Sequence, residues 1–278
     1  MAFKTPLQFV ASLTADFAEG AAGLRHNSAR HTTNWLDIGC GDGLVAAALA
    51  TYGCQVTAID GSEKSIAEAR ANGVNATLIK MQDFEHEPFD IILISRALHH
   101  MPPLAETLQK VQKLLKPEGT LIIEDFAREV VDERAASWLF QRAEHYISAE
   151  AKQNPSAQAQ DEHSHKDPDC KAGRDRHAWL RERPASDHDA KRLWHEHFVS
   201  DHHLATGSEM QFALESFFQV KSFSKMPSLF RHICDFLPAT ADGADTAAQI
   251  WAEEMALIER ESIPAVGFRV VLAARSGL

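Results

Sequence analysis

Short apolar runs alternate with amphipathic stretches over the first half of the chain. Five runs have the length and β-branched content of strands: Asn34–Ile38, Gln55–Ile59, Ala76–Lys80, Phe89–Ser95 and Thr120–Glu124. The stretches between them predict helices over Leu44–Thr51, Glu63–Asn72 and Leu104–Leu115. This alternation is typical of a parallel sheet with helices on both faces.

The alternation stops after Asp125. Residues 127–206 contain no strand pattern and are predicted to be mostly helical, with a polar interruption over Gln153–Arg176. Ser186, with Asp189 three residues on, predicts the start of a helix that runs to about Ala205. Strand and helix patterns then return, with helices over Glu209–Phe217 and Thr246–Ile258 and strands over Gln219–Ser224 and Gly267–Ala274.

Composition and charge indicate an ordinary globular protein. The 278 residues are 45% hydrophobic, and the formal net charge of -11 argues against a DNA-binding surface, which needs a positive footprint. The four cysteines are scattered without a C-x-x-C pair, which favours reduced thiols. There is no signal-peptide pattern and no apolar run of the ~20 residues that span a bilayer. We therefore expect a cytoplasmic protein without a membrane span.

A glycine-rich turn follows the first predicted strand. The segment Asp37–Gly43 reads DIGCGDG, and Asp60 ends the second strand 21 residues after Gly39. A turn without side chains before a helix, with a carboxylate one strand away, suits a nucleotide-like ligand. Dinucleotide folds use G-x-G-x-x-G, whereas position 44 is Leu and an acid ends strand one, where it would repel a pyrophosphate. A cofactor with a cationic amino-acid end fits better.

Five ordered segments carry a family resemblance: Asp37–Gly43, Ala58–Ser62, Gln82–Phe84, Phe89–Met101 and Leu114–Leu121. With these segments in this order, the chain resembles the class I S-adenosylmethionine-dependent methyltransferases. It resembles in particular the branch that methylates quinones and other small molecules. The last segment departs from the family at Glu118, where many relatives have glycine. The resemblance is weaker from Gly207 to Ala274.

The resemblance implies roles for individual residues. Asp37 would hold the ammonium of S-adenosylmethionine, directly or through water, and Asp60 would accept from the ribose hydroxyls. Asp83 would accept from the adenine amino group while the Phe84 amide donates to a ring nitrogen. The full set of implied cofactor-binding residues is Asp37, Gly39, Cys40, Gly41, Asp60, Gly61, Asp83, Phe84, Ser95 and Arg96. Ser95 and Arg96 would sit beside the transferred methyl.

The implied fold is an α/β, Rossmann-like, mostly parallel seven-stranded sheet with helices on both faces, its last strand antiparallel. Residues 1–30 would form an N-terminal helical segment, with a helix over Pro6–Leu24. Residues 31–126 and 207–278 would form the core, and residues 127–206 would be a helical lid inserted after strand five. The implied activity is in-line transfer of a methyl group to a small-molecule oxygen, nitrogen or carbon acceptor.

Nine of the fifteen histidines lie between His145 and His203, in the predicted lid. One or more could be a general base, since imidazole titrates near neutral pH. His188, His195 and His202 also repeat every seven residues on one predicted helix face, which leaves a metal site or a solvated face as alternatives. The absence of an H-E-x-x-H or cysteine–histidine motif favours no metal. The candidate catalytic residues are His195, His202 and, from the loop after strand four, His100.

Two other functions remain open on this reading. One is methylation of RNA or protein, and the other is a module that binds the cofactor without transferring the methyl. The cofactor motifs contain no information on the acceptor side, so they do not separate these alternatives. The acceptor and the oligomeric state, with a homodimer among the choices, are also left open.

Overall fold

The protein is described by a computed structural model over residues 3–21, 33–153, 178–200 and 203–275. The chain divides into two compact units. Unit 1 consists of Met1–Pro6, Val130–Asp201 and Pro227–Pro264. Unit 2 consists of Leu7–Glu129, His202–Met226 and Ala265–Leu278. The prediction assigned residues 227–264 to the core, but the structure groups them with the helices that follow strand five.

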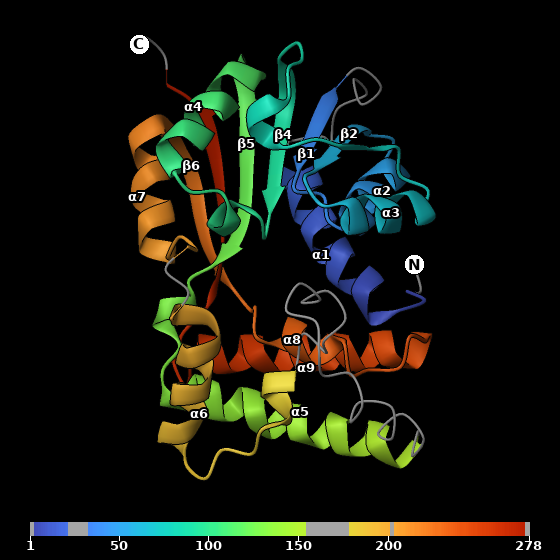
Figure 1. The fold of residues 1–278 in the computed structure, drawn as a ribbon, viewed down its shortest axis with the longest axis vertical. Coiled ribbons are helices and arrows are strands. Elements are labelled where there is room, and N and C mark those ends of the chain that lie inside the picture. The colour runs from blue at the N-terminus through green and yellow to red at the C-terminus, as the bar shows by residue number, and fades with distance from the viewer. Residues whose placement is uncertain (1–2, 22–32, 154–177, 201–202, 276–278) are drawn as a thin grey trace, which may run out of the picture. The chain divides into compact units, whose positions relative to one another are not determined.

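Unit 2 contains a seven-stranded sheet in the order β3-β2-β1-β4-β5-β7-β6 (Figure 1). The strands are β1 (Asn34–Ile38), β2 (Gln55–Asp60), β3 (Ala76–Leu78), β4 (Phe89–Ser95), β5 (Leu115–Phe126), β6 (Phe218–Met226) and β7 (Gly267–Ala274). Neighbouring strands from β3 to β5 are parallel, and β7 is antiparallel to both β5 and β6. The predicted mostly parallel sheet with an antiparallel last strand is therefore confirmed.

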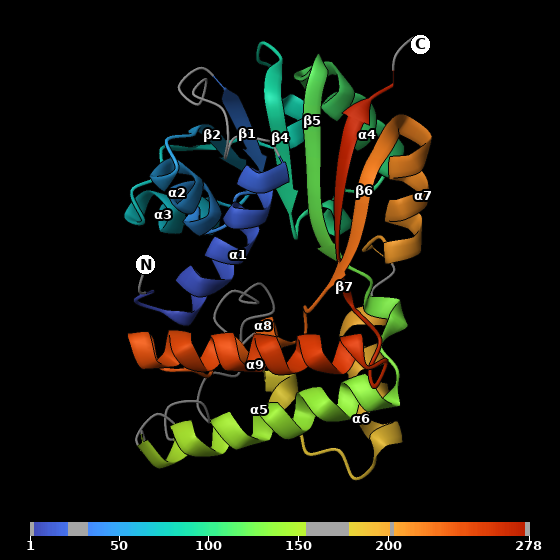
Figure 2. The same ribbon diagram turned by 180° about the vertical axis from the view of Figure 1, so that it is seen from behind.

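Helices cover the two faces of this sheet. They are α1 (Pro6–Ala21), α2 (Leu44–Thr51), α3 (Glu63–Ala71), α4 (Leu104–Leu114) and α7 (Gly207–Phe217). Ala15 and Ala18 of α1 join Trp35 and Leu49 in one buried cluster, while α4 and α7 build the larger cluster on the opposite face. Figure 2 shows α1 on the face of the sheet that is turned toward the viewer. The central strands are buried on both faces, as parallel strands usually are.

Two consecutive acids of β5 point to opposite faces of the sheet. Glu124 receives a hydrogen bond from Thr14 of α1 at 2.8 Å and an ion pair from Arg269 of β7 at 2.7 Å. Side chains alternate along a strand, so Asp125 faces the other way, where it meets His99. Glu124 thus fixes α1 to the sheet, and Asp125 bonds to His99 in the loop after β4.

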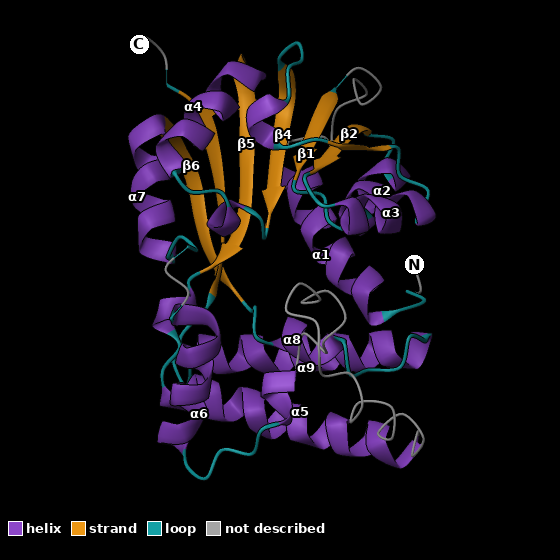
Figure 3. Ribbon diagram, viewed as in Figure 1, coloured by secondary structure: helices purple, strands orange, loops and turns teal. Residues whose placement is uncertain are grey.

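The described residues of unit 1 form helices joined by loops, without a strand (Figure 3). Its α-helices are α5 (Glu133–Gln153), α6 (Asp187–Trp194), α8 (Phe230–Cys234) and α9 (Ala241–Glu259), with short segments η7 (Ala178–Arg181) and η8 (His195–Val199). Aromatic rings fill its interior: Trp179 packs edge-on against Trp194 at 5.9 Å and Phe140 at 5.5 Å. Within the described residues, no helix is both long and apolar enough to cross a membrane.

Four of the differences between the predicted elements and the structure have a bearing on the fold. Strand β5 begins at Leu115, ahead of the predicted turn, because Leu115 pairs with Phe89 across a register shift. Ser186 caps its helix as expected, but α6 ends at Trp194 and η8 continues as a π-helix, with the Ser200 amide bonded to the His195 carbonyl at 3.0 Å. Apolar periodicity does not distinguish these two windings. Helix α8 was not predicted, and α9 begins five residues early.

Glu254 of α9 is a buried carboxylate that holds the start of α8. Its oxygens accept from the amides of Ser228 at 2.8 Å, Leu229 at 3.0 Å and Phe230 at 2.8 Å. Burial raises the pKa of Glu254 to about 7. The carboxyl group supplies the acceptors that these buried amides, at a helix N-terminus, need.

We expect Glu254→Ala to lower the free energy of unfolding by about 3 kcal/mol, because three buried amides lose their acceptor. Urea denaturation followed by fluorescence would measure the change. Glu259→Ala, at an exposed position of the same helix, is the matched control and should change stability little. Equal stability of the two variants would show that the contact does not hold α8.

Candidate functional site

The glycine turn after β1 has the backbone that the sequence motif requires. Gly39, Gly41 and Gly43 have φ values of 72°, 54° and 74°, which side chains rarely tolerate. A Cβ atom on Gly39 would lie 2.5 Å from the Cβ of Ala97, so the turn packs directly on the loop after β4. A Cβ atom on Gly41 would meet nothing within 4 Å among the described residues, so the space beside this backbone is open.

Asp37 places a buried carboxylate beside the turn. Its side chain belongs to β1, only 2% of the residue is exposed, and Oδ2 has no hydrogen-bond partner among the described residues. Burial raises its pKa to about 7, and the charges of Asp60 and Asp42 add to the shift. A buried, unpaired carboxylate is costly for the ligand-free fold. A cationic group that reached Oδ2 would remove this cost.

Asp60 closes the turn from the neighbouring strand. Its Oδ2 accepts from the Gly41 amide at 3.0 Å and its Oδ1 accepts from the Ser62 amide at 2.8 Å. Each carboxylate oxygen has a second lone pair, so Asp60 keeps acceptor capacity for a ligand. Gly61 is exposed next to it. The structure thus brings Asp37, Asp60 and the glycine turn together at the carboxyl ends of β1 and β2.

Cys40 contributes backbone and not thiol chemistry. Its amide donates to the Ile59 carbonyl at 3.0 Å, which ties the turn to β2. Burial, with the nearby charges of Asp37 and Asp60, raises the pKa of the Cys40 thiol far above its ordinary value. A thiol in these surroundings stays protonated and is a poor nucleophile.

Asp83 and Phe84 follow β3 in the short helix η3 (Met81–Asp83). Asp83 is exposed and Phe84 is buried, with its ring stacked at 6.4 Å on Phe89. The Phe84 amide, expected to donate to an adenine nitrogen, is bonded to the Met81 carbonyl at 3.3 Å, a long contact. Both residues lie beyond the carboxyl ends of the strands, as a ligand-binding role requires.

Ser95 and Arg96 end β4 and begin its loop. Arg96 has a φ of 54°, its amide donates to the Glu124 carbonyl at 2.7 Å, and its guanidinium lies 5.1 Å from the centre of the Phe126 ring. A positive φ is uncommon outside glycine and marks a backbone held by its surroundings. The contact of Ala97 with the glycine turn places this loop next to Gly39.

The candidate catalytic histidines lie in different parts of the chain. His100 is exposed in η4 (Leu98–His100) of unit 2, with its ring 4.1 Å from that of His99. His195 is exposed at the start of η8 in unit 1, and its Nδ1 lies 3.4 Å from the Ser200 hydroxyl. His202 lies outside the described residues. The described residues include no group of three histidines, cysteines or carboxylates placed to hold a metal.

A buried contact between His99 and Asp125 was not among the predictions. Nδ1 of His99 lies 2.7 Å from Oδ1 of Asp125, and both side chains are buried. The signal was present, because a histidine follows strand four and an acid ends strand five. The contact could not be predicted without knowing that β4 and β5 are adjacent and that Asp125, not Glu124, faces this loop.

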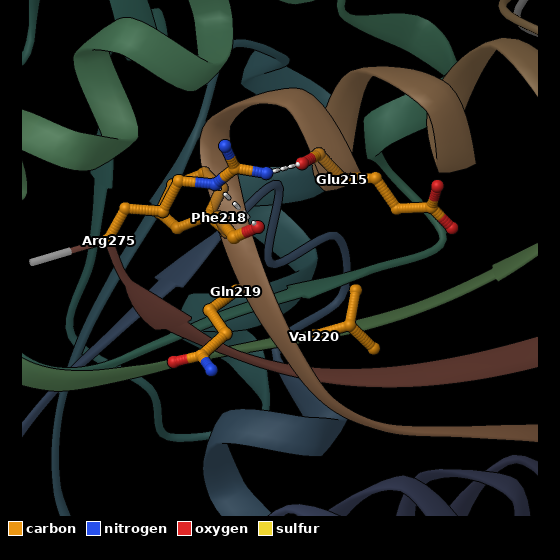
Figure 4. Close-up of a pocket in the computed structure, with 5 residues that line it drawn as sticks. All are labelled: Glu215, Phe218, Gln219, Val220 and Arg275. Atoms are coloured by element: carbon orange, nitrogen blue, oxygen red, sulfur yellow. Dashed lines mark hydrogen bonds between the residues drawn. The ribbon is translucent and has the colours of Figure 1, made fainter.

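A separate hollow of about 610 Å³ lies between α7 and the edge strand β6. Figure 4 shows Arg275 reaching over it, with its guanidinium bonded to the carbonyls of Glu215 and Phe218. Phe218 begins β6 opposite Ala274, near the amino-terminal part of β5. The hollow therefore lies toward the amino ends of the parallel strands, whereas the glycine turn lies at their carboxyl ends. Ligands of such sheets bind at the carboxyl ends.

A sequence model of the family described as "Methyltransferase domain" matches residues 9–188, more than half of the chain. The chain belongs to this methyltransferase-domain family. Among curated proteins, the ubiquinone biosynthesis O-methyltransferase of Caulobacter vibrioides is 36% identical over 97 residues, covering 32% of this chain and 38% of the relative. The protein of the same name from Xylella fastidiosa is 36% identical over 102 residues, covering 34% and 42%.

The matched part spans about two fifths of the length of these curated relatives. Among solved structures, the plantazolicin methyltransferase BpumL in complex with a desmethylplantazolicin analogue and SAH is similar with a TM-score of 0.50 and 15% identity. That similarity covers 96% of this chain and 86% of the other. At this identity it supports the methyltransferase fold alone.

We expect Asp37→Asn to stabilise the ligand-free methyltransferase-family protein. The pKa of Asp37 is higher in the folded than in the unfolded state, so its ionisation costs stability, and this cost grows as the pH rises from about 4 to about 7. Removing the charge is worth about 4 kcal/mol at pH 8 for a pKa raised from 3.8 to about 7, and the buried, unpaired Asn amide costs about 2 kcal/mol, so the free energy of unfolding should rise by about 2 kcal/mol. The gain should be smaller at pH 5.

Urea unfolding at the two pH values measures this difference. Glu118→Gln removes an exposed carboxylate of the same unit and is the control, expected to change stability little at either pH. A loss of stability in Asp37→Asn at pH 8 would mean that the ligand-free fold already compensates the Asp37 charge.

Proposed function

We propose that this protein transfers a methyl group from S-adenosylmethionine to a small-molecule acceptor by in-line displacement. The observation that carries the proposal is the unpaired Oδ2 of Asp37 beside an open glycine turn. Membership of the methyltransferase-domain family supports the same reaction.

The charges around the turn favour this cofactor over a phosphate-bearing one. Asp37, Asp42 and Asp60 are close enough for the two others to raise the pKa of Asp37, so the turn has a negative potential. Such a potential repels a pyrophosphate and attracts the ammonium and sulfonium groups of S-adenosylmethionine. The ammonium would bind Oδ2 of Asp37, and the open space beside Gly41 would admit the rest of its amino-acid portion.

The remaining cofactor contacts follow from the order of the strands. Asp60 at the end of β2 would accept from the ribose hydroxyls, and Asp83 after β3 would accept from the adenine amino group. For the Phe84 amide to donate a hydrogen bond to the adenine, its long hydrogen bond to the Met81 carbonyl would have to open. Ser95 and Arg96, at the end of β4, would lie on the methionine side because the loop that follows packs on Gly39.

When bound, the cofactor supplies a methyl group on a positively charged sulfur. The task of the protein is then to orient the acceptor and to exclude water, which together lower the barrier of a displacement. The two curated relatives are named as O-methyltransferases, which favours an oxygen acceptor here. The predicted use of the helical residues after β5 as a lid, including His195 and His202, remains part of this proposal.

The broader setting follows from the same observations. Among the described residues Cys40, Cys54 and Cys234 form no disulfide, which suits a reducing cytoplasmic compartment. A net charge of -11 favours a small molecule over RNA or DNA as the partner. A homodimer remains a prediction, as does the alternative of a binding module without transfer activity.

Titration calorimetry with S-adenosylmethionine and S-adenosylhomocysteine from pH 6 to pH 8 tests the proposal. Binding of the ammonium requires ionised Asp37, whose pKa is about 7, so the affinity should rise as the pH rises through 7. Because one proton is displaced, the slope should approach but not exceed tenfold per pH unit below pH 7. Above pH 7.5 the affinity should level off.

Asp37→Asn should weaken binding at pH 8 by about 10- to 100-fold and remove the slope, whereas Glu118→Gln should keep both affinity and slope. Absence of detectable binding to the wild-type protein would refute the proposal. Tight binding without a pH slope would place the ammonium away from Asp37.

A further inference from the structure

The pair formed by His99 and Asp125 has the geometry of a positioned base. Nδ1 of His99 lies 2.7 Å from Oδ1 of Asp125, and the two side chains are 7% and 0% exposed. A carboxylate at this distance from a buried imidazole holds the ring in one orientation and one tautomer.

The backbone around His99 is held as firmly as its ring. Its amide donates to Oδ2 of Asp125 at 3.3 Å, and its carbonyl accepts from the Ala205 amide at 2.9 Å. Arg128 holds Ala205 in turn by donating to its carbonyl. The Phe126 ring packs edge-on against the imidazole at 4.9 Å. Contacts from two separate segments, residues 125–128 and Ala205, thus hold this imidazole and its backbone in place.

The pairing with Asp125 assigns the protonation state of the neutral ring. Asp125 accepts, so Nδ1 carries the proton and Nε2 carries the lone pair. Within the described part of the chain no residue forms a hydrogen bond to Nε2. A histidine with one nitrogen bonded to a carboxylate and the other free is arranged to accept a proton.

The pair lies at the sheet edge where the cofactor is proposed to bind. His99 follows β4 and Asp125 is the penultimate residue of β5, and β1, β4 and β5 are consecutive parallel strands. Ala97, two residues before His99, packs on Gly39 of the turn. Neighbouring strands are about 4.8 Å apart, so the pair is displaced from the β1 turn by one to two strand spacings.

We propose that His99 is the general base for a hydroxyl acceptor and that Asp125 is its positioning residue. This inference rests on the proposed function. The acceptor oxygen forms a bond to the methyl carbon, the carbon–sulfur bond breaks with its electron pair passing to sulfur, and the hydroxyl proton passes to Nε2 of His99. The sulfonium becomes a neutral thioether, and Asp125 stabilises the imidazolium. The proton then leaves to solvent.

His99, and not its neighbour His100, is the base in this proposal. His100 was the candidate, but it is exposed, whereas His99 has a buried carboxylate on Nδ1. The exposed His195 has only a 3.4 Å contact from its Nδ1 to a hydroxyl. A hydroxyl contact does not stabilise an imidazolium as a carboxylate does.

Nitrogen NMR of ¹⁵N-histidine-labelled protein, with and without S-adenosylhomocysteine, tests the protonation state without an acceptor. The resonances of His99 are those that disappear in His99→Gln. At pH 8 they should show the Nδ1–H tautomer, and Asp125→Asn should change it. An Nε2–H tautomer in the wild-type protein would overturn the proposal, because that nitrogen could not take a proton.

Kinetics with a panel of catechols, including 3,4-dihydroxybenzoate, tests the chemical step through formation of S-adenosylhomocysteine. His99→Gln should lower kcat by about 10²- to 10⁴-fold. With saturating S-adenosylmethionine, so that Asp37 titration does not contribute, it should also remove the fall of kcat at low pH. Asp125→Asn should show a partial loss. Glu118→Gln, at an exposed position outside this site, should behave as wild type.

The affinity for S-adenosylhomocysteine separates the two levels of the proposal. If His99→Gln binds it as the wild type does and loses turnover, His99 acts on the acceptor side. Equal kcat values in variant and wild type, or an unchanged acid limb, would overturn the role of His99 and leave the proposed function standing. If the wild type binds S-adenosylhomocysteine but methylates none of the catechols, the tautomer of His99 found by NMR decides whether the proposed role of His99 stands.

Discussion

A buried carboxylate next to a turn without side chains is the constraint on which the rest of the site depends. Asp37 is 2% exposed, its Oδ2 has no partner in the described residues, and burial with two neighbouring acids raises its pKa to about 7. Water or a cation must compensate such a group, and the open backbone at Gly41 provides the approach. The ligand-free fold therefore carries a local instability that a cationic ligand relieves, as expected where function and stability compete.

The sheet places the other groups around this point. The order β2-β1-β4-β5 brings the carboxyl ends of four consecutive parallel strands to one edge, and Asp60, Asp37, the loop of Arg96 and Asp125 are found there in that order. Because side chains alternate along β5, its two neighbouring acids have partners on opposite faces of the sheet. Glu124 fixes α1 through Thr14 and Arg269, and Asp125 orients His99 on the other face.

Local patterns were sufficient to predict the glycine turn with the carboxylates beside it, but not the contact between His99 and Asp125. The turn Asp37–Gly43 and the carboxylate of Asp60 are encoded in short contiguous segments whose backbone demands are visible in the residue types. The pairing of His99 with Asp125 joins segments 26 residues apart and depends on strand order and on which face a side chain takes. The same limit explains why α8 and the role of Glu254 were missed, since three amides and their acceptor come from separate segments. The start of β5 at Leu115 shows that a turn signal yields to pairing with a neighbouring strand.

The most direct measurement is a crystal structure of the protein with S-adenosylhomocysteine. The ammonium nitrogen should lie about 2.7–2.9 Å from Oδ2 of Asp37, or be bridged to it by one water, with the amino-acid portion along the Gly41 backbone. A ligand bound elsewhere, or one that turns its carboxylate toward Asp37, would contradict the assignment of the turn as the cofactor site.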